Sequence, residues 1–401
     1  MRFTAAAAFL ASTLPLVARA APAPAQNTPQ TDYDAIIVGG GPAGLSALSG
    51  LARVRRKVLL IDSGVYRNAE TRYMHDVLGF DGVKPDYFRW AARQQLSHYD
   101  TVTMTNGTVS RIQPQQNNAY FTVTSKDAAG KEQSLTAKKI ILGTGIRDLI
   151  PDTPGLRENW AQGIFWCLWC DGHEHADQAL GIIGPLTDVM GDVRNALTLN
   201  KDMVVLANGT DTAASRDALD KANPGWQKFL QLHNIKVENR VIKSIEVLEK
   251  DNGTSSNARL PSQPEHYLFR VNFDSGEPLL RNAFLTSFPN EQYSTLGQDL
   301  GVQMVSGRLA VDSTKGLMTS VPGVYAVGDC NSDGVTNVPH ALFSGKRAAV
   351  YLHAQLARET AYAETGEVAR RSIHKEARWL WDFMNPQHDM LNGGRFNQYG
   401  Q

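Results

Sequence analysis

The stretch YDAIIVGGGPAG, residues 33–44, decides the fold of this chain. Its first half is an apolar, β-branched run typical of a buried strand, and its second half is a glycine-rich turn that leads into a helix. Gly39 allows the tight turn, Gly41 lets the backbone approach a pyrophosphate, and Gly44 lets the helix pack close to the sheet. The stretch therefore predicts a dinucleotide-binding α/β domain with its ligand at the helix N-terminus.

Three further apolar runs fit a parallel sheet around this first strand. Residues 57–61 end at Asp62, 18 residues after Gly44, where an acid can accept a hydrogen bond from a ribose hydroxyl. Residues 139–145 end in small residues, and residues 323–329 end in an acid. Small residues at strand ends suit a cofactor that lies across the carboxyl edge of the sheet. We expect the final acid to bond the sugar-alcohol chain of a flavin.

The segment FWCLWCDGHEH, residues 165–175, carries the chemistry that we expect. Thiols three residues apart can close a small disulfide ring, and a thiolate at a helix start is a nucleophile. Asp171 follows directly, and a carboxylate beside aromatic residues tends to have a raised pKa, which suits proton transfer. Redox catalysis is favoured over zinc binding and over a purely structural disulfide. The zinc ligands would be Cys167, Cys170, His173 and His175.

These motifs, in this order and spacing, resemble the FAD-binding pyridine nucleotide–disulfide oxidoreductases over about residues 32–358. Residues 67–68 and 75–82 look like the FAD-wrapping loop of the low-molecular-weight thioredoxin reductases and their fungal relatives. The resemblance implies FAD, a homodimer, and a redox disulfide between Cys167 and Cys170. It implies that Cys170 faces the flavin, that Cys167 exchanges with substrate, and that Asp171 is the acid/base.

The candidate site residues follow from the motifs and the resemblance together. The catalytic candidates are Cys167, Cys170, Asp171 and His173, with a hydrogen-bonded or solvated role as the alternative for His173. The candidate cofactor-binding residues are Gly39, Gly41, Pro42, Ala43, Gly44, Asp62, Arg67, Asn68, His75, Gly143, Thr144, Gly145, Asp329, His340 and Ala341. No metal site is expected, and the third cysteine, Cys330, is predicted to be a buried small apolar residue.

A reductase of this family carries a second dinucleotide loop for NADPH, and here that loop is degenerate. It is expected in LGIIGPLTDV, residues 180–189, where Gly184 is present but Leu186 and Val189 replace the other two glycines. We expect the Leu186 side chain to stand where the backbone should meet a pyrophosphate. Residues 203–210 offer no arginine for a 2′-phosphate. Electrons are therefore expected from a substrate dithiol rather than from NADPH, with O2 as acceptor and H2O2 as product.

This combination resembles the fungal dithiol oxidases of the gliotoxin oxidoreductase type. The resemblance implies that the chain closes a disulfide in a small-molecule dithiol of the epipolythiodioxopiperazine kind. Three alternatives remain open: an NADPH-dependent thioredoxin reductase-like enzyme, a secretory-pathway sulfhydryl oxidase acting on protein thiols, and a non-enzymatic FAD- or zinc-binding protein.

The N-terminus is a separate segment with a targeting pattern. Residues 1–20 combine a basic start, an apolar stretch and the small-x-small sequence Ala18-Arg19-Ala20, which is typical of a secretory signal peptide rather than a transit peptide. We therefore expect a secreted or secretory-pathway protein. Glycosylation sequons begin at Asn106, Asn208 and Asn252, although chance alone gives roughly as many.

Composition excludes several other classes. The 401 residues include 40 basic and 40 acidic ones, so the net charge of zero gives no footprint for nucleic acid. Three cysteines exclude a disulfide-stapled scaffold, and no apolar run reaches the roughly 18 residues that span a bilayer.

The expected fold class is α/β, with two Rossmann-like, doubly wound, three-layer domains, the FAD domain being split by an inserted nucleotide-binding-like domain. The predicted segments are a signal peptide (1–20), a linker (21–31), the first FAD part (32–150), the inserted NADPH-type domain with the two cysteines (151–284), the second FAD part (285–358) and a C-terminal extension (359–401).

Overall fold

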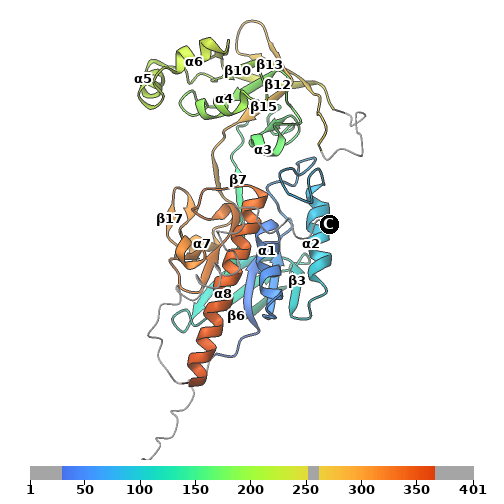
Figure 1. The fold of residues 1–401 in the computed structure, drawn as a ribbon, viewed down its shortest axis with the longest axis vertical. Coiled ribbons are helices and arrows are strands. Elements are labelled where there is room, and N and C mark those ends of the chain that lie inside the picture. The colour runs from blue at the N-terminus through green and yellow to red at the C-terminus, as the bar shows by residue number, and fades with distance from the viewer. Residues whose placement is uncertain (1–28, 252–261, 366–401) are drawn as a thin grey trace, which may run out of the picture.

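The computed structural model describes residues 29–251 and 262–365. Figure 1 shows two α/β domains, one above the other, joined by a narrow connection. The first domain contains the elements of residues 33–148 and 290–365, and the second domain contains those of residues 164–286. The fold class predicted from the sequence is confirmed: each domain is a Rossmann-like sheet with helices packed on it.

The first domain is built on a nine-stranded sheet whose centre is parallel. Its main order is β19-β20-β21-β6-β1-β2-β3, with β5 paired to β6 and β4 paired to β5. Its strands are β1 (Tyr33–Val38), β2 (Val58–Asp62), β3 (Val102–Asn106), β4 (Thr108–Gln115), β5 (Tyr120–Lys126), β6 (Glu132–Leu142), β19 (Val311–Asp312), β20 (Met318–Thr319) and β21 (Val324–Ala326). Because β1, β2, β6 and β21 run parallel, their carboxyl ends meet at one edge.

Helices cover one face of this sheet and cross closely. They are α1 (Pro42–Ala52), α2 (Pro85–Leu96) and α8 (Val338–Thr365). A Cβ atom on Gly50 would lie 2.6 Å from the Cβ of Ala349, so a glycine is required where α1 meets α8. The opposite face packs against β4, β5 and the short α7 (Leu296–Asp299). Both faces of the sheet are therefore buried, which fits the continuous apolar runs of its strands.

The second domain has a five-stranded sheet of order β11-β10-β9-β15-β8, with every strand pair parallel. Its strands are β8 (Ile164–Phe165), β9 (Leu180–Ile183), β10 (Met203–Leu206), β11 (Lys236–Glu238) and β15 (Ala283–Thr286). The helices are α3 (Leu168–Asp171), α4 (Met190–Ala196), α5 (Ala213–Ala222) and α6 (Trp226–Leu232). An antiparallel sheet packs on the other face, formed by β12 (Ile242–Glu249), β13 (Leu268–Phe273) and β14 (Leu279–Arg281).

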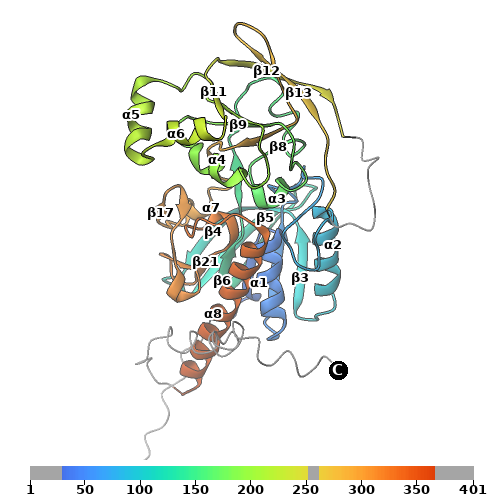
Figure 2. The same ribbon diagram turned by 45° about the horizontal axis from the view of Figure 1, so that its top comes forward.

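The two domains are connected by a pair of short antiparallel strands, β7 (Ile146–Asp148) and β16 (Asn290–Gln292). A further small pair, β17 (Met304–Val305) and β18 (Arg308–Leu309), lies on the first domain. Figure 2 shows α3 at the bottom of the second domain, facing the first domain. The redox segment, residues 165–175, contains α3 and therefore lies next to the carboxyl edge of the first sheet.

Two predicted segment boundaries fall inside single elements. The boundary after residue 284 cuts β15, whose last residues, Leu285 and Thr286, pair with β9 in the second domain. The boundary after residue 358 cuts α8, which continues unbroken to Thr365. Strand pairing and helix continuity place both boundaries later in the chain.

Some expectations concern residues beyond those that the structure describes. The signal peptide (1–20), most of the linker (21–31), Asn252 and residues 366–401 of the extension lie outside the described residues. Within residues 29–251 and 262–365, no helix is long and apolar enough to cross a bilayer.

Candidate functional site

A cavity of about 430 Å³ opens at the carboxyl edge of the first sheet and extends to the redox segment of the second domain. Its lining combines the loops after β1, β2 and β6, the turn after β21, the start of α8, and part of α3. The predicted site residues that line it are Gly39, Gly41, Pro42, Ala43, Arg67, Asn68, His75, Gly143, Thr144, Gly145, Cys170, Asp171, Asp329 and Ala341. The cavity therefore brings together candidates from six separate parts of the sequence.

The glycine loop after β1 leaves room for a ligand where the sequence predicted it. A Cβ atom on Gly41 would meet nothing within 4 Å, so the backbone is accessible from the cavity side. Gly39 has a φ of +107°, and a Cβ there would lie 2.3 Å from the carbonyl oxygen of Gly143. Gly44 packs against the loop, since its Cβ would lie 1.9 Å from the Gly39 oxygen. An open, glycine-lined cradle at the N-terminus of α1 fits the pyrophosphate of FAD.

Asp62, the predicted ribose-binding residue, lies beneath the glycine loop. Its side chain is buried beneath Gly40, where an added Cβ would lie 2.0 Å from Asp62 Oδ2. The same oxygen accepts hydrogen bonds from the Tyr66 hydroxyl at 2.5 Å and from Arg93 at 2.8 Å. Asp62 is not among the residues that line the cavity. The structure therefore places Asp62 where it supports the glycine loop and the chain after β2, and its part in ribose binding stays a prediction.

Arg67 contacts two acids of the cavity lining, Asp148 at the end of β7 and Asp329 in the turn after β21. It makes a bidentate ion pair with Asp148, with both nitrogen–oxygen distances at 2.8 Å, and a longer contact with Asp329 at 3.3 Å. Its guanidinium also lies 5.1 Å from the ring centre of Trp166. Burial raises the pKa of Asp329, whereas Arg67 acts in the opposite direction. Arg67 thus fixes the end of β7 and the turn after β21 around the cavity.

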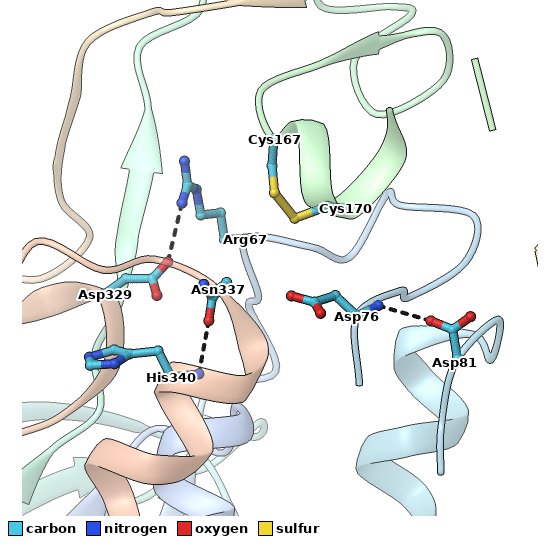
Figure 3. The surroundings of a disulfide bond; sticks show 8 residues. All are labelled: Arg67, Asp76, Asp81, Cys167, Cys170, Asp329, Asn337 and His340. Carbon is cyan, nitrogen blue, oxygen red and sulfur yellow. Dashed lines mark hydrogen bonds and ion pairs between the residues drawn. A yellow bond between two sulfur atoms is a disulfide. The ribbon is translucent and has the colours of Figure 1, made fainter. Parts of the chain in front are cut away.

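The two cysteines of the redox segment form a disulfide. Cys167 is the N-cap of α3, and Cys170 lies inside that short helix. Cys170 lines the cavity, whereas Cys167 does not. Figure 3 shows Cys170 on the side of the disulfide that faces the first-domain loop carrying Asp76. The disulfide therefore excludes the zinc arrangement in this state, because its sulfurs are bonded to each other rather than free as thiolates.

Asp171 lines the cavity next to Cys170. Desolvation raises the pKa of its carboxyl well above the usual range, and the carboxylates of Glu265 and Glu174 raise it further. Burial also raises the pKa of Glu265 to about 7, although Arg72 opposes that rise. A carboxyl with a raised pKa holds its proton closer to neutral pH, which suits a group that transfers protons.

The histidines of this region do not reach the cavity. His173 is exposed, outside the cavity lining, beyond the turn at Gly172 that ends α3, so the structure does not bring this catalytic candidate to the cavity. His175 is buried and stacked on Phe165 with ring centres 5.1 Å apart. Desolvation lowers the pKa of His175 to about 4, which keeps it neutral in the core.

His340, a candidate cofactor-binding residue, also lies outside the cavity lining. Its Nε2 lies 2.7 Å from Asp333 Oδ2, and its ring is not part of the cavity lining. Its backbone N–H donates to Oδ1 of Asn337, which caps the start of α8. Figure 3 shows the His340 ring pointing away from the disulfide. The position three residues into the helix turns this side chain outward, while Ala341 faces the cavity.

The degenerate loop after β9 is closed. Leu186 is buried with the apolar core of the second domain, so the expectation that its side chain projects into the pyrophosphate position is wrong. Instead, its backbone N–H is already bonded to the Thr210 hydroxyl at 3.0 Å. Val189 is buried too, and a Cβ on Gly184 would lie 2.9 Å from its side chain. The loop is therefore packed from within by the residues that replace the two glycines.

Sequence reasoning missed several residues of the cavity. Asp148 follows the GTG segment closely, and an acid at that strand end was a usable signal. Trp166 and Trp160 stack with ring centres 4.9 Å apart and form an aromatic wall above the cavity. Trp166 directly precedes Cys167, but Trp160 gave no signal, because its partnership depends on the turn before β8.

The cavity, the glycine cradle and the adjacent disulfide together define an FAD-dependent disulfide oxidoreductase. Comparisons with known proteins agree. The sequence profile of the pyridine nucleotide-disulphide oxidoreductase family matches residues 33–185. A protein of Arthroderma benhamiae named probable thioredoxin reductase is 45% identical over 347 residues, which cover 84% of each chain. Thioredoxin reductase aclD of Aspergillus oryzae is 32% identical over 81% of this chain and 96% of its own.

Solved structures have the same fold. HlmI superposes with a TM-score of 0.67 at 26% identity, covering 84% of this chain and 98% of that chain. Putative thioredoxin reductase TrxB from Bacillus anthracis gives a TM-score of 0.69 at 24% identity, covering 82% and 99%. This chain belongs to the FAD-binding pyridine nucleotide–disulfide oxidoreductase family, in its thioredoxin reductase-like branch.

Proposed function

We propose that this oxidoreductase is a dithiol oxidase that forms a disulfide in a small-molecule dithiol, with O2 as final acceptor and H2O2 as product. The overall reaction consumes one dithiol and one O2, and it yields one disulfide and one H2O2. The observation that carries the proposal is the contrast between the two glycine loops. The loop after β1 is open to the cavity at Gly41, whereas the loop after β9 is filled by Leu186 and Val189.

Electrostatics at the second loop add to this contrast. Asp192 lies in the first turn of α4, where a nucleotide phosphate would otherwise interact with the helix N-terminus. Arg216, the nearest arginine after β10, makes a bidentate ion pair with Asp211 at 2.5 and 2.6 Å. A 2′-phosphate would have to displace that carboxylate. These features disfavour NADPH as the electron donor.

The mechanism that we propose begins with thiol–disulfide exchange. A substrate thiolate attacks Cys167, which breaks the Cys167–Cys170 bond and leaves Cys170 as a thiolate beside the cavity. The second substrate thiol then displaces Cys167, so that the product leaves as a disulfide and the enzyme holds two reduced cysteines. Asp171 accepts or returns the protons of these steps. FAD bound in the cavity supplies the two-electron acceptor that lets O2 restore the enzyme disulfide.

The small-molecule substrate class draws support from relatives. Thioredoxin reductase aclD of Aspergillus oryzae and thioredoxin reductase tcpT of Claviceps purpurea are 32% and 30% identical to this chain. Both come from fungi, and we propose that this chain acts on a small dithiol metabolite of the epipolythiodioxopiperazine kind.

Oxygen uptake tests the proposal. We expect the purified, FAD-loaded protein to consume O2 when a small dithiol such as dithiothreitol is added, with one H2O2 formed per disulfide. NADPH should not accelerate this uptake. Reduced peptides that carry two cysteines are the comparison substrate for a sulfhydryl oxidase of protein thiols.

The names of the relatives favour one competing function, an NADPH-dependent thioredoxin reductase-like enzyme. That function requires NADPH to reduce the enzyme disulfide. NADPH-dependent reduction of a disulfide substrate, without net O2 uptake from dithiols, would replace our proposal with this one.

A further inference from the structure

One loop of the first domain makes ionic contacts to the second domain. This bridging loop, residues 63–84, connects β2 to α2. From it, Arg72 Nη1 lies 2.5 Å from Asp251 Oδ2, 3.2 Å from the Tyr267 hydroxyl and 3.3 Å from Glu265 Oε2. All three partners belong to the second domain. Their side chains are well shielded from water, with exposures of 7% for Asp251 and 11% for Glu265.

A second contact from the same loop reaches the redox segment itself. His75 Nε2 lies 3.5 Å from Glu174 Oε1, and Glu174 follows Cys170 by four residues. Glu174 also accepts a hydrogen bond from Ser262. His75 lines the cavity together with Cys170. The bridging loop therefore contacts both the redox segment and the strand region that packs behind it.

These contacts matter because the covalent connection between the domains is slender. The paired strands β7 and β16 have three residues each. A short two-stranded connection sets the approximate position of the second domain but resists rotation weakly. Electron transfer between a thiol and a ring needs contact, and a misplacement of about 1 Å can cost on the order of a hundredfold in rate.

We propose that Arg72 is a positioning residue, which clasps the second domain through Asp251, Glu265 and Tyr267 so that Cys170 is held at the mouth of the FAD cavity. The inference rests on the proposed function only in taking the Cys167–Cys170 pair as the group that exchanges electrons with the cavity. Arg72 is not among the residues that line the cavity, so its effect passes through the orientation of the domains.

The test compares Arg72→Gln and Arg72→Lys with a matched control, Arg270→Gln. Arg270 pairs with Glu246 at 3.1 Å within the second domain and makes no contact across the interface in the described structure. Each FAD-loaded protein is mixed with dithiothreitol without oxygen. Two rates are recorded: opening of the enzyme disulfide, by quenched alkylation and mass spectrometry, and bleaching of flavin absorbance.

In Arg72→Gln we expect flavin bleaching to slow by about tenfold or more, while disulfide opening stays within about twofold of the wild-type rate. Arg72→Lys keeps the charge and should recover part of the bleaching rate. Arg270→Gln should match the wild type in both rates. A merely structural role for Arg72 would instead lower FAD content and thermal stability without separating the two rates.

Equal bleaching rates in Arg72→Gln and the wild type, with FAD content intact, would overturn the proposal. If Arg72→Gln fails to fold, Tyr267→Phe removes one partner of the clasp, and an unchanged bleaching rate there counts against it equally. Dithiothreitol reduces the enzyme whether or not O2 is the natural acceptor. Absence of O2 uptake in the wild type would therefore refute the dithiol oxidase proposal. The anaerobic rates of the Arg72 variants and the wild type could still be compared.

Discussion

Cys167 and Cys170 share one bond yet have different surroundings. Cys170 lines the cavity with Asp171, whereas Cys167 caps α3 and lies outside that lining. This difference fits the order of events in the proposed exchange, in which a substrate thiolate attacks Cys167 and Cys170 is the sulfur that faces the cavity. Single substitutions of Cys167 and Cys170 can test this division of roles.

Replacing each cysteine by serine should stop turnover in both cases but trap different species. In Cys170→Ser, the remaining Cys167 thiol can still exchange with a disulfide substrate analogue, and no neighbouring thiol releases the adduct. We therefore expect a stable mixed disulfide, visible as an added mass. Cys167→Ser should accumulate little adduct, because Cys170 is turned to the cavity. An adduct that forms on Cys167→Ser instead would reverse the assignment.

Asp171→Asn should lower turnover by about a hundredfold, since an amide of the same size cannot exchange a proton. The pKa of the Asp171 carboxyl is raised by desolvation, so the wild-type rate should change with pH above the range in which an ordinary aspartate titrates, and the variant should lose that dependence. Asp177→Asn is the matched control, because Asp177 is an exposed acid in the same segment with a φ of +60°, which asparagine tolerates. Steady-state rates between pH 5 and 9 provide the measurement.

How far individual residues could be predicted depended on whether their partners were local. Gly39, Gly41 and the cysteine pair were recognisable because short sequence motifs with fixed spacing indicate their roles. The contact between Asp62 and Arg93 could not be predicted, because Arg93 comes from α2, 31 positions away. The outward position of the His340 ring could not be predicted, because helical phase at the start of α8 decides which side chain faces the cavity.

At the scale of elements, the short helix α3 brings acids together at the domain interface. Asp171 at its end is surrounded by Glu174 and by Glu265, which precedes β13. Burial raises the pKa of Glu265 from its ordinary value of 4.5 to about 7. The folded protein therefore keeps a proton on Glu265 at pH values where the unfolded chain releases it.

The raised pKa of Glu265 predicts how the stability of the folded protein depends on pH. Because the folded state binds the extra proton between about pH 4.5 and 7, the contribution of Glu265 is unfavourable above that window and vanishes below it. We expect the unfolding midpoint to fall as the pH rises from 5 to 7.5, and Glu265→Gln to flatten that fall by several degrees. Glu246→Gln, an exposed acid paired with Arg270, is the control. An unchanged slope in Glu265→Gln would show that other groups set it.

The elements themselves were largely predictable, and their pairings were not. Apolar runs ending in glycine or acid predicted β1, β2, β6 and β21, because buried parallel strands need continuous apolar sequence. The predicted boundary after residue 284 separated Leu285 and Thr286 from the rest of β15, although both pair with β9. A strand of four residues carries no sequence signal for its neighbours in the sheet.

At the scale of the whole molecule, the two α/β domains differ in what their glycine loops can hold. The first keeps an open cradle against a large cavity, and the second has filled its loop with its own side chains. The sequence predicted this asymmetry from two substituted glycines. It could not predict the interface, because Arg72 and its partners lie about 180 to 195 positions apart along the chain.

The proposed passage through the secretory pathway also belongs to this scale. Asn106 and Asn208 are exposed in the structure. When the complete chain is expressed in a fungal host, we expect secreted protein that loses mass on endoglycosidase treatment. Asn208→Gln should remove one glycan. Protein retained inside the cell without any glycan would contradict the proposed localisation.

The most direct test of the central claim is a rapid-mixing experiment on the FAD-loaded protein without oxygen. The flavin absorbance is followed after mixing the protein with a small dithiol or, in a separate run, with NADPH. Our account predicts that the dithiol bleaches the flavin, that this requires both Cys167 and Cys170, and that NADPH leaves the absorbance unchanged. Rapid bleaching by NADPH, or bleaching by dithiol that survives loss of either cysteine, would contradict it.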